Sequence, residues 1–215
     1  MRRERLLLAI DTVSPATEVR LLGNGGIRER VVGEEGGGVF SRRGKDVAPL
    51  VADLLRRSGL ELTEIAGVAV TIGPGSYTGI RVGVAAVQGL FFGTDVSVYP
   101  LSTFALLEEV LEREKAGEGT VAVQTRRNEW AVRKEGQVKI IEGGEWSREL
   151  REPVAVLGTV PEHFSGRWFS GNNRLLDGVG RVIESRALLP SKAAELEPWY
   201  VGDCYAISRR LGEER

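Results

Sequence analysis

Apolar positions in the first part of the chain form three short runs followed by a helical stripe. The runs over residues 6–11, 17–22 and 27–32 are separated by turn residues, which predicts strands joined as an antiparallel meander. The glycine-rich stretch 33–38 follows them and is typical of a surface loop. From residue 45 apolar side chains recur at intervals of three and four positions, which predicts a helix that Gly59 ends.

The middle of the chain predicts a strand, a glycine-rich turn and a strongly apolar helix. Residues 68–72 have the continuous apolar pattern of a buried strand. The turn GPGSYTG (73–79) leads from that strand into a helix predicted over 80–92. A further strand over 96–99 is expected to end at Pro100, because proline cannot donate a hydrogen bond to a neighbouring strand.

The second half of the chain returns to a strand-rich pattern after one more helix, which Ser102 is expected to cap. The polar, glycine-containing stretch 115–120 marks a boundary, so we predict one lobe over 1–116 and a smaller one over 117–215. The order of elements indicates an α/β fold. Strands are predicted over 121–125, 130–134, 138–141, 154–157 and 168–169, and short helices over 174–186 and 191–196.

Composition narrows the classes of function. Lys plus Arg is 29 and Asp plus Glu is 30, which argues against a strongly basic nucleic-acid binder. The single cysteine, Cys204, excludes an intramolecular disulfide or a zinc site of several cysteines, and it favours a reducing, cytoplasmic compartment. We expect this thiol to be buried or incidental. The single histidine, His163, excludes every catalytic or metal scheme that needs two imidazoles.

Two apolar segments could suggest membrane targeting, and neither fits it. The run after the basic start MRRER is too short for a signal peptide and is better interpreted as a strand. Residues 65–107 carry few charges, but glycine and proline interrupt them before the roughly 20 residues that a bilayer requires. We therefore expect a soluble protein with no membrane partner.

The glycine-rich turn and the end of the first predicted strand are the candidate sites for phosphate. Backbone N–H groups around Gly73, Gly75 and Ser76 could bind an anion, although a tight turn with close helix packing explains the same residues. The turn is not a Walker A loop, because no Lys-Ser/Thr pair follows its glycines. Asp11, followed by Thr12, either caps the turn after its strand or keeps a vestigial nucleotide contact.

The helix predicted over 80–92 is apolar nearly all round and carries a stripe of small residues that includes Gly83 and Ala86. Leaving its large side chains in water would cost roughly 1.5–3 kcal/mol each. We therefore expect a sheet to cover one side and another helix or a partner subunit to cover the other. The predicted partner interface consists of Val47, Leu50, Val51, Leu54, Leu55, Ile80, Gly83, Val84, Ala86 and Val87.

Three segments together resemble the bacterial TsaB (YeaZ) family. These are AIDT near the start, GPGSYTGIRVGVAAVQGL and the later VYPLSTFALL, which span about residues 5–107. The match weakens beyond them, where AVQTRRNEWAV and EPWYV are similar to later family segments. The resemblance implies an actin-like ATPase fold with two ribonuclease-H-like lobes, of which the C-terminal one is reduced.

The resemblance also implies partners. Members of this family are the dimerization subunit for TsaD, which transfers a threonylcarbamoyl group to adenosine 37 of tRNAs reading ANN codons. The ATPase subunit TsaE docks on that pair, and tRNA contact would be shared through the complex. The paired surface would be a helical bundle formed by the two predicted helices, and the same surface would allow a homodimer when the chain is alone.

Two departures from the family bear on nucleotide and metal chemistry. SRRGKD (41–46) lacks a histidine that the family often carries there, and Gln124 replaces an acid. An actin-like nucleotide-binding protein with weak ATPase activity is the alternative, with Asp11 organising Mg²⁺. Gln124 argues against turnover by such a site. ATP or ADP with Mg²⁺ at the partner interface is thus left open, and we expect no metal site of the chain's own.

Other chemistry is weighed against simpler interpretations. A metalloprotease of this fold would need an H-x-x-x-H pair, which one histidine cannot supply. Ser76 does not lie in a G-x-S-x-G elbow, and His163 is expected in a surface loop, so serine hydrolysis has no support. Arg126 and Arg127 beside Trp130 form either a small patch for tRNA or an ordinary solvated hairpin, and the near-neutral net charge favours the hairpin.

Overall fold

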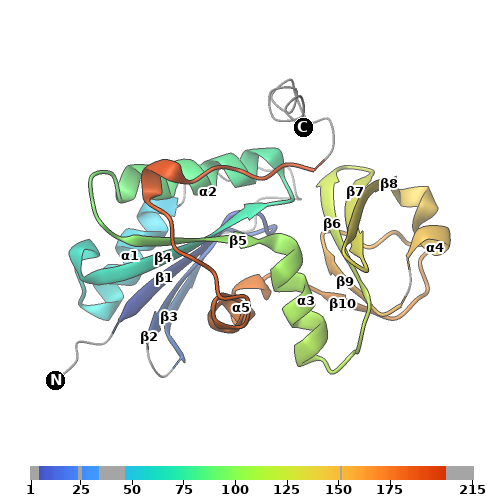
Figure 1. Ribbon diagram of the computed structural model, residues 1–215, viewed down its shortest axis with the longest axis horizontal. Helices are drawn as coiled ribbons and strands as arrows, with labels where there is room; N and C mark the ends of the chain where they lie inside the picture. The colour runs from blue at the N-terminus through green and yellow to red at the C-terminus, as the bar shows by residue number, and fades with distance from the viewer. Residues whose placement is uncertain (1–4, 24–25, 34–46, 151, 202–215) are drawn as a thin grey trace.

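The computed structural model describes residues 5–23, 26–33, 47–150 and 152–201. These residues form two five-stranded sheets with helices against and between them (Figure 1). The predicted loop over 34–38 and Cys204 lie outside the described residues. None of the helices in the described ranges combines the length and the apolar character needed to cross a bilayer.

The first sheet has the order β3-β2-β1-β4-β5. Strands β1, β2 and β3 pair antiparallel, as their three apolar runs predict, and β4 and β5 continue the sheet parallel to β1. The alternation of one antiparallel meander with two parallel strands is that of a ribonuclease-H-like sheet. The strands are β1 (Leu6–Asp11), β2 (Glu18–Gly23), β3 (Gly26–Val32), β4 (Ile65–Gly73) and β5 (Ser97–Ser102).

Two helices cover one face of this sheet (Figure 1). Helix α1 (Val47–Ser58) packs on β2 and β3, and helix α2 (Tyr77–Leu90) packs on β4 and beside α1. Helix α3 (Thr103–Arg113) lies between the two sheets, because it contacts β4 and β5 of the first and β6 and β9 of the second.

The second sheet repeats the topology of the first with the order β10-β9-β6-β7-β8. Its first strand again pairs antiparallel with the second and parallel with the fourth. The short helix α4 (Trp146–Glu149) stands where the first sheet has α1, and the described residues 158–167 between β9 and β10 contain no helix. The chain is therefore an actin-like α/β protein with a reduced second half. Its strands are β6 (Thr120–Arg126), β7 (Glu129–Lys134), β8 (Gln137–Glu142), β9 (Val154–Leu157) and β10 (Trp168–Ser170).

The last described residues return to the first sheet. After the 3-10 turn η4 (Leu175–Gly178) and helix α5 (Val179–Ser185), Ser191 pairs with Val98 of β5. Further along, the backbone N–H of Trp199 donates to the carbonyl of Ile72 at 2.8 Å. This returning segment therefore becomes part of the wall around the glycine-rich turn, and the lobe boundary at residue 116 stays a prediction.

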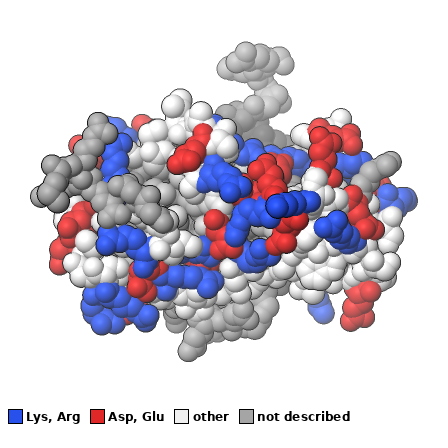
Figure 2. Space-filling model, turned by 90° about the horizontal axis from the view of Figure 1, so that it is seen from below, with Lys and Arg blue, Asp and Glu red and all other residues white. Residues whose placement is uncertain are grey.

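Charged side chains of both signs are mixed on the face seen from below (Figure 2). The chain as a whole has 29 basic and 30 acidic residues. Between the two halves, Glu108 of α3 accepts hydrogen bonds from Arg133 of β7 and from Arg186 after α5.

Three predicted boundaries are wrong. Helix α2 begins at Tyr77 rather than residue 80, since Ser76 caps it by accepting a hydrogen bond from the Gly79 N–H at 3.4 Å. Strand β5 continues through Pro100, which is tolerated because β5 is the edge of the sheet order. The helix predicted over 191–196 is only the 3-10 turn η5 (Ala193–Glu195).

Candidate functional site

The end of β1 is joined to the start of α2 by side-chain hydrogen bonds. The Thr12 hydroxyl donates to the Gly79 carbonyl at 2.7 Å. Oδ1 of Asp11 accepts from the Val13 N–H at 2.9 Å and from the Thr71 hydroxyl at 2.9 Å. Asp11 and Thr12 have no exposed surface. The geometry therefore supports the capping interpretation of Asp11, while a vestigial nucleotide contact stays a prediction.

Burial raises the pKa of Asp11 above its ordinary value, and the hydrogen bonds that its carboxylate accepts oppose that rise only in part. Its second oxygen, Oδ2, is buried and has no hydrogen-bond partner among the described residues. A carboxylate held in this way is costly to keep ionised, so Asp11 links the stability of the fold to pH.

Replacing Asp11 by asparagine is expected to change how stability depends on pH. Because the folded-state pKa of Asp11 is raised, its favourable contribution is complete below the unfolded value of 3.8 and is lost as the pH rises through the folded pKa. The wild type should therefore gain stability relative to Asp11→Asn as the pH falls. Urea unfolding of both proteins between about pH 7 and about pH 4 measures this difference, and a constant difference would contradict the raised pKa.

The glycines of the turn are required by close packing. A Cβ on Gly75 would lie 2.1 Å from Cγ1 of Val13, and one on Gly73 would lie 2.2 Å from the carbonyl oxygen of Trp199. Both glycines also have positive φ angles, of 154° and 122°. This packing supports the tight-turn interpretation, while anion binding by the turn stays a prediction.

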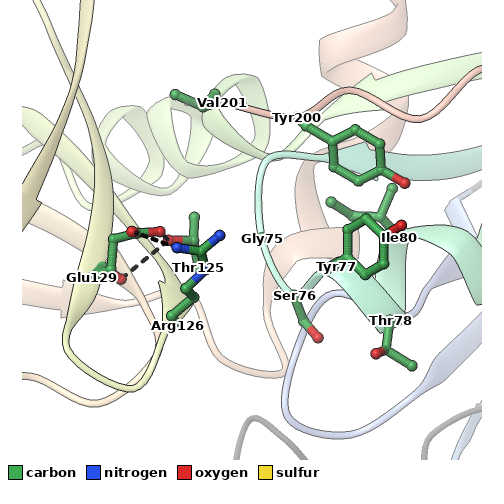
Figure 3. Close-up of a pocket in the computed structure, with 10 residues that line it drawn as sticks. All are labelled: Gly75, Ser76, Tyr77, Thr78, Ile80, Thr125, Arg126, Glu129, Tyr200 and Val201. Carbon is green, nitrogen blue, oxygen red and sulfur yellow. Dashed lines mark hydrogen bonds and ion pairs between the residues drawn. The ribbon is translucent and has the colours of Figure 1, made fainter. Parts of the chain in front are cut away.

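A cavity of about 210 Å³ lies between the start of α2 and the hairpin that joins β6 to β7 (Figure 3). Of the five residues predicted for phosphate contact, Gly75 and Ser76 line it, and Asp11, Thr12 and Gly73 do not. Sequence reasoning did not bring the other lining residues together at one site, because the returning C-terminal segment and the hairpin meet α2 only in the folded chain. These are Tyr77, Thr78, Ile80, Thr125, Arg126, Glu129, Tyr200 and Val201.

The predicted partner-interface residues are mostly inside the chain, so this set requires correction. All of them except Leu50 and Ala86 are buried by the chain's own sheet and helices. Within the small-residue stripe of α2, Gly83 packs inward, since a Cβ there would lie 2.5 Å from the Thr12 hydroxyl oxygen, whereas Ala86 is half-buried. The buried residues, which cannot contact a partner in this arrangement, are Val47, Val51, Leu54, Leu55, Ile80, Gly83, Val84 and Val87.

The outer faces of α1 and α2 are formed by different residues. Ala48 and Ala52 are exposed on α1, and Ala85 and Gly89 are exposed on α2. A Cβ added at Gly89 would have no neighbouring atom within 4 Å among the described residues. Phe92, just past the end of α2, is 84% exposed. The two helices therefore present four small residues and, just past the end of α2, one large apolar ring. The same helices also expose Pro49, Arg56, Arg57, Thr78 and Arg81.

Of the two interpretations of Arg126, Arg127 and Trp130, the structure supports the ordinary hairpin. Trp130 is 2% exposed and packs against Trp146 with ring centroids 4.6 Å apart, so it cannot stack on a nucleic-acid base. Arg126 and Arg127 are exposed beside it in the hairpin. Gln124, buried below them, donates to the Arg127 carbonyl at 3.0 Å and accepts from the Thr159 N–H at 3.1 Å, which gives it a structural role.

Comparison with known proteins places this fold in a family. The family model for TsaD, tRNA N6-adenosine threonylcarbamoyltransferase, matches residues 37–147, more than half of the chain. The tRNA threonylcarbamoyladenosine biosynthesis protein TsaB of Escherichia coli is 31% identical over 168 residues, which cover 75% of this chain and 68% of that protein. TsaB of Haemophilus influenzae is 36% identical over 124 residues, 57% of this chain and half of that protein.

A solved structure agrees with this result at the level of the fold. YeaZ from Pseudomonas aeruginosa is 23% identical and superposes with a TM-score of 0.66, covering 92% of this chain and all of that chain. The sequence identities, the matched family model and the shared fold together show that the chain belongs to the TsaB (YeaZ) family.

Proposed function

We propose that the protein is a non-catalytic subunit that pairs with TsaD. In this role it supports the transfer of threonylcarbamoyl to N6 of adenosine 37 in tRNAs reading ANN codons, with TsaE docking on the pair. Alone, it forms a homodimer through the same surface. The names of its TsaB relatives support a role in threonylcarbamoyladenosine biosynthesis.

The observation that carries the pairing is the outer face of α1 and α2. The exposed residues Ala48, Ala52, Ala85 and Gly89 lie on two helices that pack side by side on the first sheet. Small side chains allow the backbone of another helix to approach closely, as in a helical bundle. Phe92 beside them supplies the large apolar group that a stable interface needs.

The supporting role fits the chemistry-bearing residues of the chain. The single histidine cannot form an H-x-x-x-H pair for a metal. Asp11 is fully buried as a turn cap, and Gln124 stands where an actin-like enzyme carries an acid. ATP or ADP with Mg²⁺ at the partner interface stays a prediction, and the weak ATPase alternative gains no support from the buried Asp11.

Replacing Ala85 by tryptophan is expected to abolish pairing with TsaD. The new ring would project from the outer face of α2, where it would hold a partner helix away without meeting the chain's own core. We expect the variant to melt within a few degrees of the wild type, and to elute apart from TsaD in size-exclusion chromatography.

Glu184→Trp is the matched control, because Glu184 is exposed on α5, away from α1 and α2 (Figure 1). This variant should elute together with TsaD as the wild type does. The pairing surface would be misplaced if Ala85→Trp bound TsaD with wild-type affinity.

A further inference from the structure

The cavity beside α2 has aromatic rings on one wall and a cation on the other (Figure 3). Tyr77 and Tyr200 lie against each other with ring centroids 5.2 Å apart and planes inclined by 31°. Arg126 extends from the opposite wall, where it forms an ion pair with Glu129 at 3.2 Å. The site therefore combines stacking surface with positive charge on two elements that the fold holds facing each other.

The size of the cavity limits what can enter. Val13 packs against the lining residue Gly75, and Asp11 and Thr12 have no exposed surface. The volume of about 210 Å³ is below the 300–1,000 Å³ of pockets that hold drug-sized ligands. A nucleoside triphosphate therefore does not fit with its phosphates inside, whereas one planar group can enter from the outside with the rest of its chain on the surface.

Three arginines lie at or next to residues that line this cavity, of which Arg126 is the lining one. The Arg81 guanidinium lies 5.2 Å from the Tyr77 ring centroid and donates to the Tyr77 hydroxyl at 2.5 Å. Arg126 is 51% exposed, and Arg127 next to it is also exposed. Among the residues that line the cavity, Glu129 is the one carboxylate. Exposed arginines beside the lining residues can contact the phosphates of a strand that crosses the mouth of the cavity.

We propose that this cavity binds one unpaired base of a single-stranded RNA. The tyrosine pair offers the stacking surface for the base, and Arg81, Arg126 and Arg127 hold the flanking phosphates. Single-stranded RNA is recognised in this way, by bases splayed onto aromatic rings and arginine planes. The inference rests on the proposed function, which gives the protein a role on tRNA, and it assigns a contact to this chain itself.

The test is the affinity of the full chain for a fluorescently labelled single-stranded RNA of about eight nucleotides, measured by anisotropy. Tyr200→Ala should weaken binding by between about fivefold and a hundredfold, the loss expected when one stacking ring is removed. Tyr200→Phe keeps the ring and should bind as the wild type does. Equal affinity of the wild type and Tyr200→Ala would overturn the proposal.

A second pair of variants separates the site from general charge. Arg126→Ala should weaken binding and reduce its salt dependence, whereas Arg148→Ala removes an exposed arginine of α4 and should change neither. Equal binding of a fully paired duplex of the same sequence, or binding of free ADP with none of the RNA, would also overturn the proposal. If Tyr200→Ala does not fold, Arg126→Ala against Arg148→Ala decides the question.

The same variants distinguish this proposal from the pairing with TsaD. Arg126→Ala should elute with TsaD like the wild type, because Arg126 lies in the hairpin and not on the outer face of α1 or α2. If the wild-type chain pairs with TsaD but does not bind the RNA, only the proposed RNA site is refuted. If it binds the RNA but does not pair with TsaD, only the proposed subunit role is refuted.

Discussion

Gly79→Leu is expected to lower the free energy of unfolding by at least about 3 kcal/mol, the upper end of the usual cost of overpacking. A Cβ at this position would lie 2.2 Å from the Thr12 carbonyl oxygen, which belongs to the backbone and cannot rotate away. The Gly79 carbonyl also accepts a hydrogen bond from the Thr12 hydroxyl, and a shift of α2 would break this hydrogen bond. Urea denaturation measures the loss.

Gly89→Ala, near the other end of the same helix, should have the opposite effect. Its added Cβ would meet nothing within 4 Å. Alanine is favoured over glycine in a helix by roughly 0.8–1.0 kcal/mol, so this variant should gain stability. If both substitutions destabilised the protein to a similar extent, the assignment of the inward and outward faces of α2 would be wrong.

Arg20→Ala is expected to cost about 3 kcal/mol or more of stability. Arg20 is 1% exposed, and it binds Glu18 at 2.5 Å and Asp177 at 2.6 Å. Because Glu18 is equally buried, removing the guanidinium leaves a carboxylate in the core with only Arg30 of the described residues beside it. The contact with Asp177 also joins β2 to the turn η4 that follows the second sheet.

The pH dependence of this network has a defined sign. Burial alone would raise the pKa of Asp177. The hydrogen bonds from Arg20 and Arg113 outweigh that effect and hold this pKa below its ordinary value. Its contribution is therefore present above 3.8, the unfolded value, and is lost as the pH falls through the lowered pKa. Thermal unfolding of the wild type and Arg20→Ala near neutral pH measures the main effect.

Arg148→Ala is the matched control for that experiment. Arg148 pairs with Glu145 at 2.9 Å, but its side chain is 73% exposed, so its loss should cost less than about 1 kcal/mol. An equally small effect of Arg20→Ala would show that the buried network does not stabilise the fold.

The sequence predicted the strands better than the phase of the helices. The meander β1 to β3 and strand β9 follow from short apolar runs, because the pattern of neighbouring residues and the turns between them are local signals. Helix α2 is apolar on nearly every side, so its pattern cannot tell which side meets the sheet. The contact of Gly79 with Thr12 decides that orientation, and no local signal contains it.

The cavity was beyond sequence reasoning for a similar reason. Tyr200 reaches Tyr77 only because the segment before it returns to β5 and because Trp199 binds Ile72. The sequence places Arg126 in an exposed hairpin, but it does not show that Tyr77 and Tyr200 face this arginine, whereas its neighbour Trp130 belongs to a buried cluster around Trp146. Patterns of neighbouring residues describe elements, whereas this site depends on how three distant segments meet.

Reconstitution of tRNA modification tests the subunit role most directly. TsaD, TsaE, tRNA, ATP and threonylcarbamoyl-adenylate are incubated with the wild-type chain, with Ala85→Trp or without this protein, and threonylcarbamoyladenosine is quantified after digestion of the tRNA. We expect modified adenosine with the wild type and almost none in the other two reactions. Equal modification in all three would contradict a requirement for this chain.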